Sequence, residues 1–375
     1  MPRNLTNLLP SGRPRRVAGK GWNGGTALGF QAARIPAAEV GALYEQVASN
    51  ICDLFPGEYE VVTSMIPAYA TKPDFGDIDV LLHGPAKYME RIKGNPGAVF
   101  PNWSGHIYSN GGVVSVGIKH GGGIAQVDII STGEDWAKHM AAYSYFAYND
   151  LGNLMGRIAH RMGFKFGHEG LSYMLRDETT GHVYGEYKFD MAHSDILEFM
   201  GLDAARWEAG FQTLEEIFEF VASSPYFHPA IYLLDNVNAV SRVRDKKRKT
   251  YMTFLDWLER RGPRETDLEF RTDADKRIFR EYLFRCKMLS DPDFATWVQG
   301  AKFAHAETGY AKVFFDGARV MEWSGLSGKE LGAFIGDFRD HVEARSVLTF
   351  SEFVVMMQGD IRKFAMDFFN QWKEA

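Results

Sequence analysis

Three aspartates are the residues of this sequence whose types and spacing point most directly to chemistry. Asp77 and Asp79 lie two residues apart in the segment GDIDVLLH (76–83), and side chains two apart in a strand lie on the same face of a sheet. Asp128 lies in a second apolar run, VDII (127–130), where an unpaired charge would be costly to bury. If the two strands are neighbours, the three carboxylates converge on one site.

Such a cluster has a chemical use and a structural alternative. Adjacent carboxylates repel one another unless a cation neutralises them, and oxygen ligands of this kind suit Mg²⁺ or Mn²⁺. Three carboxylates can hold two ions, an arrangement that supports in-line phosphoryl transfer. The alternative is that Asp77 and Asp79 only open a strand beside a turn, while Asp128 forms a salt bridge.

The elements that must position these aspartates form a mixed pattern. Apolar residues recur every three or four positions between Pro36 and Pro56, which predicts a helix. Three glycines at 121–123 predict a hairpin between two β-like runs. Strands are expected over 58–65, 77–83, 112–120 and 124–131. Helices are expected over 134–163 and over almost all of the chain after Asp195. The predicted fold class is therefore α+β, a mixed β-sheet with helices followed by an all-helical C-terminal part.

The same region resembles a known family. Residues 35–225 are similar, in order, to the palm and thumb of DNA polymerase β-like (family X) enzymes, in the nucleotidyltransferase superfamily. GDIDVLLH is similar to the family's G-D-M-D-V-L-L-T-H strand, which carries its first two metal-binding aspartates, and QVDIIS (126–131) resembles R-I-D-I-R-L, which carries the third. Three further matches are IPAAEVGALYEQVASNICDLFPG (35–57), SYFAYNDLGNLMGRIAHRMGFKF (144–166) and HSDILEFMGL (193–202).

The resemblance implies a nucleotidyltransferase palm over 35–150 and a thumb-like region over 151–225. It also implies that Asp77, Asp79 and Asp128 bind two Mg²⁺ or Mn²⁺ ions, and that Asp128 helps to activate an attacking 3′-hydroxyl group. The substrates would be an NTP or dNTP and the 3′ end of an RNA or DNA, with pyrophosphate as the leaving group. This agrees with the phosphoryl transfer inferred from the carboxylates alone.

The sequence departs from the family in the phosphate-binding turn. The family's G-S-x-R-R-G is replaced by TSMIPAY (63–69), with about three extra residues before Asp77. Ser64 could still offer a hydroxyl to the γ-phosphate, and Lys72 is the nearby cation that could stand in for the arginines. Lys72 can equally be a solvated lysine of the loop.

Further nucleotide-binding candidates follow the predicted strands. Tyr145 and Phe146 match the start of the family's Y-F-T-G-S segment, which contacts the sugar and base. Its Gly-Ser is absent here, so the choice between ribo- and deoxyribonucleotide stays open. Asn153 and Arg157 are four residues apart, hence on one helix face, and look like the Asn and Arg that the family directs at the base and the template. The alternative is a polar pair on the helix surface.

Two segments are basic enough to contact nucleic acid. Residues 1–34 are rich in Gly, Pro and Arg and are expected to form a basic, loosely structured arm. The run RVRDKKRK (242–249) precedes Tyr251, Phe254 and Trp257, so it could track a phosphate backbone while the aromatic rings stack on bases. The alternative is that these rings form a buried helix face. The candidate nucleic-acid ligands are Arg242, Arg244, Lys246, Lys247, Arg248 and Lys249.

The tail offers a further resemblance. Residues 314–338 are weakly similar to a glycine-rich helical element in the tails of CCA-adding enzymes and poly(A) polymerases. Four glycines lie there three or four residues apart, namely Gly325, Gly328, Gly332 and Gly336. Small residues at this spacing allow close approach of a backbone, although tight helix packing is the alternative. Residues 226–375 are therefore expected to form a helical domain that binds the acceptor.

Composition bounds the class of protein. The 375 residues include 42 Lys and Arg and 48 Asp and Glu, for a net charge of −6. This mild acidity alone would argue against a nucleic-acid partner, but it averages over the basic segments. Only two cysteines, Cys52 and Cys286, are present, which excludes a disulfide scaffold and favours a reducing, cytoplasmic location. No apolar run approaches the ~18 residues of a membrane span, so no membrane partner is expected.

The leading hypothesis is a metal-dependent nucleotidyltransferase that acts on the 3′ end of a polynucleotide. It leans slightly to terminal addition of the tRNA or RNA-tail type, because of the helical tail and because no counterpart of the family's N-terminal lyase-type domain precedes Ile35. A templated, polymerase-β-like DNA polymerase is the first alternative, favoured by the palm and thumb matches. The others are nucleotidylation of a protein or small molecule, and an inactive palm that serves as a binding module.

Overall fold

The computed structural model describes residues 27–57, 61–177 and 181–374 of the chain. Most of the predicted basic arm and the first three residues of the strand predicted over 58–65 lie outside these residues. Two compact units can be separated. The first reaches to Met162 and adds Phe166–Leu171 and Asp190–Arg271, and the second contains Gly163–Lys165, Ser172–Phe189 and the residues from Thr272 onward.

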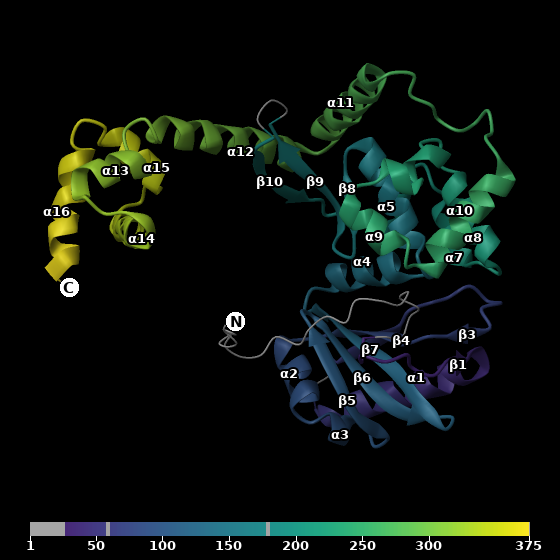
Figure 1. Ribbon diagram of the computed structural model, residues 1–375. Coiled ribbons are helices and arrows are strands. Elements are labelled where there is room, and N and C mark those ends of the chain that lie inside the picture. Colours follow the sequence, from purple (N-terminus) through teal and green to yellow (C-terminus); the bar gives the residue numbers. More distant parts are fainter. Residues whose placement is uncertain (1–26, 58–60, 178–180, 375) are drawn as a thin grey trace, which may run out of the picture. The chain divides into compact units, whose positions relative to one another are not determined.

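A five-stranded mixed sheet organises the first unit (Figure 1). In spatial order its strands are β2 (Val62–Met65), β4 (Ile78–His83), β7 (Gly123–Gly133), β6 (Val113–His120) and β5 (Trp103–Asn110). All neighbours are antiparallel except β4 and β7, which run parallel. The predicted hairpin joins β6 to β7, and its residues Gly121 and Gly122 have φ angles of +53° and +77°, which suit a tight two-residue turn.

Alternation along β4 separates an apolar face of the sheet from a polar one. Ile78, Val80 and Leu82 are 2%, 0% and 1% exposed, so their face is the buried one. Asp79 and His83 point the other way, because successive side chains of a strand lie on opposite faces. The strand that carries the carboxylate is therefore held by its apolar side.

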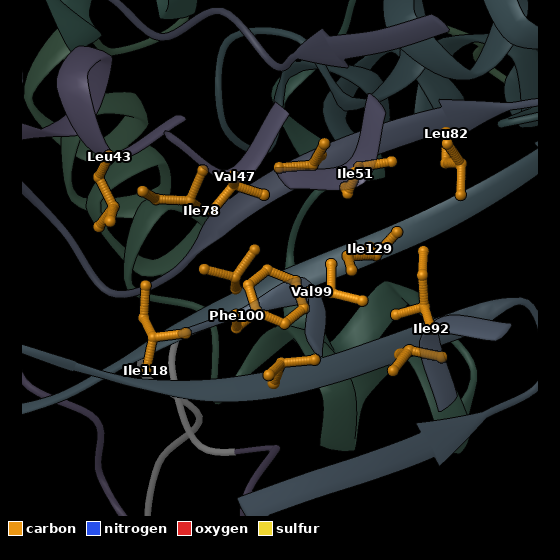
Figure 2. Close-up of a cluster of buried hydrophobic side chains, with 14 of the residues drawn as sticks. Leu43, Val47, Ile51, Ile78, Leu82, Ile92, Val99, Phe100, Ile118 and Ile129 are labelled. Carbon is orange, nitrogen blue, oxygen red and sulfur yellow. The ribbon is translucent and has the colours of Figure 1, made fainter. Parts of the chain in front are cut away.

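Helices cover the apolar face. They are α1 (Ala37–Leu54), α2 (Ala86–Gly94) and α3 (Pro96–Val99). Figure 2 shows the resulting layer, in which Leu43, Val47 and Ile51 of α1 lie against the same cluster as Ile129 of β7. Helix α1 is the one predicted between the two prolines, and its buried positions are those of the predicted apolar stripe.

The polar face is partly covered by α4 (Trp136–Phe146), which contacts β4 and β7. The turn at 147–150 leads from α4 into α5 (Leu151–Met162), a helix that is buried over most of its length. The short strands β1 (Ile35–Pro36) and β3 (Asp74–Phe75) pair with each other beside this region. The other helical elements of the unit are α6 (His193–Phe199), α7 (Ala204–Ala209), α8 (Leu214–Ala222), η1 (Pro229–Ile231), η2 (Leu234–Asn236), α9 (Ala239–Asp245) and α10 (Lys249–Arg261).

The aromatic residues that follow the basic run are buried in α10. Tyr251, Phe254 and Trp257 are 0%, 0% and 3% exposed, and Leu258 completes the buried face. The Tyr251 hydroxyl donates to the Tyr232 carbonyl at 2.7 Å. The interpretation of these residues as a buried helix face is therefore confirmed, and the other interpretation, in which the rings stack on bases, is wrong.

The second unit is mainly helical and has its own core. A three-stranded sheet contributes β10 (Val183–Lys188) and most of β9 (Gly170–Arg176) to it, and the third strand is β8 (Lys165–Gly167). The helices are α11 (Asp273–Ser290), α12 (Pro292–Ala311), α13 (Gly317–Ser324), α14 (Gly328–Glu343), α15 (Phe350–Met356) and α16 (Ile361–Glu374). Phe334 and Phe338 of α14 lie at the centre of the core. The predicted helical C-terminal part and the α+β class are thus confirmed.

The glycine series of the tail does not serve tight packing within the described chain. Gly325 ends α13 in the left-handed conformation, with φ at +72°, a position that favours glycine. A Cβ atom built at Gly332 or Gly336 of α14 would meet no atom within 4 Å.

Over the described ranges, no helix is long and apolar enough to cross a membrane.

The apolar face of the sheet should dominate the stability of the first unit. Ile129 is 0% exposed, so Ile129→Ala should lower the free energy of unfolding by about 2–5 kcal/mol, because it removes buried methyl groups and leaves a cavity. Ile107, 38% exposed on the edge strand β5, is the matched control. Ile107→Ala should change the free energy of unfolding by less than about 1 kcal/mol. Urea unfolding followed by circular dichroism measures both, and equal effects would contradict this account of the core.

Candidate active site

A cavity of about 570 Å³ lies in the first unit beside the polar face of the sheet. Its wall is built from the end of the sheet, the segment 65–79, the turn at 147–150 and the start of α10. All three predicted aspartates line it. Among the other sequence candidates, Lys72, Tyr145, Phe146, Asn153, Arg248 and Lys249 line it too.

The parallel pairing of β4 and β7 places two of the carboxylates side by side. Asp79 and Asp128 are direct partners in the register of the two strands, so their side chains leave the same face of the sheet at neighbouring positions. Asp77 lies just before β4, two residues from Asp79, and lines the same cavity. The three carboxylates that were expected to converge therefore line one cavity, and two of them are direct neighbours.

The electrostatics of the three carboxylates reflect this proximity. Burial raises the pKa of Asp79 well above its usual value, and the charges of Asp77 and Asp128 raise it further. Burial, followed by the charge of Asp77, raises the pKa of Asp128 from 3.8 to about 6, although hydrogen bonds from Ser115 and Gln126 oppose the shift. A cation between these groups would remove the repulsion that causes part of both shifts.

Gln126 orients Asp128 and was not among the predicted site residues. Its side-chain Nε2 donates to both carboxylate oxygens of Asp128, at 2.9 and 3.1 Å. Its spacing of two residues from Asp128 on β7 is a signal that could have found it, since both side chains must share a face. Ser115 is the register partner of Asp128 on β6 and supports it from the other side.

Lys72 reaches the same group of carboxylates. Its Nζ donates to Oδ1 of Asn149 at 3.1 Å and lies 3.9 Å from the centre of the Phe75 ring. Burial lowers the pKa of Lys72, and the charges of Asp77 and Asp79 oppose that shift. The ammonium group thus lies within electrostatic reach of the aspartates, which is not the position of a fully solvated loop lysine.

The turn between α4 and α5 holds an unusual backbone at the rim of the cavity. Tyr148 and Asn149 have φ angles of +57° and +65°, and they are the non-glycine residues with positive φ in the described chain. Two contacts fix the turn: the Tyr148 N–H donates to the Pro67 carbonyl at 2.8 Å, and Asn149 accepts from Lys72. Strained residues of this kind persist where the surrounding structure determines them, often at functional sites.

Asn153 and Arg157 belong to a buried polar network rather than to the helix surface. Asn153 is 9% exposed; its Oδ1 accepts from Arg244 at 2.8 Å, while its Nδ2 is buried with no hydrogen-bond partner in the described residues. Arg157 forms an ion pair with Asp245, which is 0% exposed and is also bound by Arg244. Only Asn153 of the predicted pair lines the cavity.

Ser64 lies on β2 away from the cavity wall. Its hydroxyl is 2.9 Å from Nε2 of His139, whose Nδ1 is 2.9 Å from the Thr132 hydroxyl. His139 is fully buried, and burial lowers its pKa, so the ring is neutral at pH 7. Ser64 is thus engaged with α4 and is not among the residues that line the cavity.

The basic run divides into three groups. Arg242 and Arg244 are used inside the unit: Arg242 donates to the Leu234 carbonyl at 2.7 Å, and Arg244 binds Asp245 and Asn153. Arg248 and Lys249 line the cavity, where Arg248 pairs with Asp150. The third group, Lys246 and Lys247, is exposed at the end of α9 and outside the cavity wall.

The donor set of the cavity fits a hard divalent cation in its chemistry. Asp77, Asp79 and Asp128 offer only carboxylate oxygens, the ligands that Mg²⁺ and Mn²⁺ prefer, and burial, followed by the charges of neighbouring carboxylates, raises the pKa of Asp79 and Asp128. The described part of the chain contains no group of three or more His, Cys, Asp or Glu placed to hold a metal ion.

The carboxylates should make stability depend on pH. Because the folded-state pKa of Asp128 is about 6 and its usual value is 3.8, the folded protein binds more protons in this window, and stability is lost as the pH rises through it. Asp128→Asn removes this loss. Relative to the wild type, the variant should gain about 1–3 kcal/mol in unfolding free energy between pH 4 and pH 8, at about 1.4 kcal/mol per pKa unit.

Urea unfolding at the two pH values, in the presence of a chelator, measures this gain. Asp53→Asn, which changes an exposed carboxylate of α1, is the control and should leave the difference between the two pH values unchanged. An Asp128→Asn effect that is the same at pH 4 and pH 8 would contradict the raised pKa of Asp128.

No protein-family model matches this sequence, and no curated protein is significantly similar to it. The site is therefore interpreted from its own geometry and chemistry.

Proposed function

We propose that this protein is a metal-dependent nucleotidyltransferase, which transfers a nucleoside monophosphate from an NTP or dNTP to the 3′-hydroxyl of a polynucleotide and releases pyrophosphate. The observation that carries the proposal is the register pairing of Asp79 with Asp128 at a cavity that also contains Asp77. The same cavity is also lined by the cations Lys72, Arg248 and Lys249. Such a cavity suits a ligand that brings both cations and phosphates, and a nucleoside triphosphate with its divalent ions is such a ligand.

Each aspartate has a role in this proposal. Asp77, Asp79 and Asp128 would hold two Mg²⁺ or Mn²⁺ ions, which when bound stabilise negative charge on the attacking and leaving oxygens. Asp128 accepts the proton of the attacking hydroxyl group at a carboxylate oxygen. Gln126 fixes the orientation of that carboxylate through its two hydrogen bonds. Positioning of this kind accounts for most of the catalysis in phosphoryl transfer.

The fold supports the same proposal. Residues 35–150 would be the nucleotidyltransferase palm, since they contain the mixed sheet and the aspartates on its polar face. The cavity also draws on residues beyond this segment, because Asn153 and the start of α10 line it. The catalytic unit would therefore extend to the helices that follow the palm.

The exposed lysines favour a polynucleotide acceptor over a small one. Lys246 and Lys247 are exposed near Arg248 and Lys249, which line the cavity. Neighbouring cations that are exposed to solvent suit the repeating phosphates of a nucleic-acid backbone. Terminal addition and templated synthesis are two versions of this proposal. The kind of acceptor that the protein extends distinguishes them.

Nucleotide transfer tests the proposal directly. The protein is incubated with Mg²⁺ or Mn²⁺, each labelled NTP and dNTP, and single-stranded RNA, tRNA or a DNA primer–template. The wild type should extend at least one acceptor. Asp128→Asn should reduce the rate by about 100-fold or more, because a general base contributes about 10²–10⁴-fold, and Asp77→Ala should also abolish extension. Asp53→Asn is the control and should extend normally.

The outcomes separate the alternatives. Extension of tRNA or RNA supports terminal addition, whereas extension of the primer–template that follows the template base supports a DNA polymerase. Label on the protein or on a small acceptor would instead support nucleotidylation. Absence of transfer to every acceptor with every nucleotide would contradict the proposed function.

Acceptor binding should depend on salt through the exposed lysines. Each phosphate contact to a single strand contributes about −0.7 to the slope of log K against log salt concentration. A Lys246→Ala, Lys247→Ala double variant should therefore reduce the steepness of this slope by about 1.4, as measured by fluorescence anisotropy with labelled single-stranded RNA at several salt concentrations. Lys119→Ala, at an exposed lysine of β6, is the control. An unchanged slope in the double variant would exclude these lysines as phosphate contacts.

A further inference from the structure

The proposed function leaves the phosphates of the nucleotide without an obvious ligand. The turn after β2, TSMIPAY (63–69), contains no lysine or arginine. The cavity is nevertheless lined by four cationic side chains, which come from separate parts of the chain. They are Arg34, Lys72, Arg248 and Lys249.

Three of these four cations already have partners. Arg34 forms an ion pair with Asp74, Arg248 forms one with Asp150, and Lys72 donates to Asn149. Lys249 has no ion pair or side-chain hydrogen bond with any residue that the structure describes. The pKa of Asp74 is lowered mainly by the hydrogen bond from Arg34, and the charge of Lys249 adds to this. Lys249 is therefore a cation at the cavity that is available to a ligand.

Lys249 is also the first residue of α10, and the start of this helix lines the cavity. The helix has 13 residues, and no side chain caps its N-terminus. The first N–H groups of a helix have no partner within the helix, and together with the helix dipole they attract anions. Lys249 and Thr250 at this end both line the cavity. A mobile cation and a fixed positive dipole thus meet at the same place.

Asn153 supplies an independent sign that a ligand belongs here. Its side chain is 9% exposed and lines the same cavity, while its buried Nδ2 donor has no partner in the described residues. Its Oδ1 accepts from Arg244 at 2.8 Å, which fixes the orientation of the amide. An unsatisfied buried donor is costly unless a ligand or water accepts from it.

We propose that the polyphosphate tail of the nucleotide is bound at the N-terminus of α10, with Lys249 as its principal cationic ligand and Asn153 as a further hydrogen-bond donor. The choice of a nucleotide as the ligand rests on the proposed function. The site lies at the N-terminus of α10, and not in a phosphate-binding turn beside β2. The cavity is lined by five carboxylates as well as the four cations, namely Asp74, Asp77, Asp79, Asp128 and Asp150. A ligand that combines divalent cations with several phosphates complements both groups.

Binding of inorganic tripolyphosphate tests this site without any catalytic turnover. Titration calorimetry with the full-length protein, with and without Mg²⁺, should give saturable binding for the wild type. Lys249→Ala should weaken it by about tenfold or more, and Lys249→Arg should restore it, because the ligand requires charge at this position. Lys119→Ala, which changes an exposed lysine of β6 outside the cavity, is the control and should bind like the wild type.

Comparison of ATP with AMP places the contact on the distal phosphates. Lys249→Ala should reduce the affinity for ATP about tenfold and leave the affinity for AMP unchanged. Equal losses for ATP and AMP, normal tripolyphosphate binding by Lys249→Ala, or no binding by the wild type would each overturn the site. Tripolyphosphate binding that depends on Lys249 in a protein that transfers no nucleotide would refute the proposed function but keep the site. Normal nucleotide transfer by Lys249→Ala, together with unchanged affinities for ATP and tripolyphosphate, would refute the site but keep the proposed function.

Discussion

The parallel contact between β4 and β7 forces Asp79 and Asp128 to lie side by side. Burial and electrostatics both oppose this arrangement: burial, followed by the charge of Asp77, raises the pKa of Asp128 to about 6, and burial, followed by the charges of Asp77 and Asp128, raises the pKa of Asp79. The other face of the same strands supplies the opposing stabilisation. Ile78, Val80 and Ile129 are almost completely buried, and each such side chain contributes about 1.5–3 kcal/mol. The apolar layer in Figure 2 can therefore hold the carboxylates together before any cation binds.

The cations of the cavity are held in a different way. Two of them make single contacts to residues of another segment, Arg248 to Asp150 and Lys72 to Asn149. The turn between α4 and α5 supplies both of these partners, so it links the segment before β4 with the start of α10. A charged ligand could exchange these internal contacts for its own.

Sequence periodicity predicts the parts of this structure that repeat. The alternation in β4 and the apolar stripe of α1 identify the sheet, its buried face and the direction of the aspartates. The network of Arg157, Arg244 and Asp245 has no such pattern, because it joins residues about 90 positions apart. For the same reason a basic run in the sequence did not distinguish arginines that bind buried partners from lysines that face solvent. The aromatic spacing in α10 fitted both a base-stacking surface and a core, and burial decided for the core.

The left-handed turn at Tyr148 and Asn149 has a consequence for how this protein can vary. Left-handed backbone at a non-glycine residue costs up to about 1–3 kcal/mol, and less at Asn, which adopts it more readily than most residues, so glycine at position 149 would relieve part of this backbone strain. The same change would remove the amide that holds Lys72 beside the carboxylates. Stability therefore favours glycine at this position, whereas the placement of Lys72 favours Asn. Such a conflict is common where a site depends on a strained backbone. Glycine at 149 would give a more robust protein in which Lys72 is less well placed.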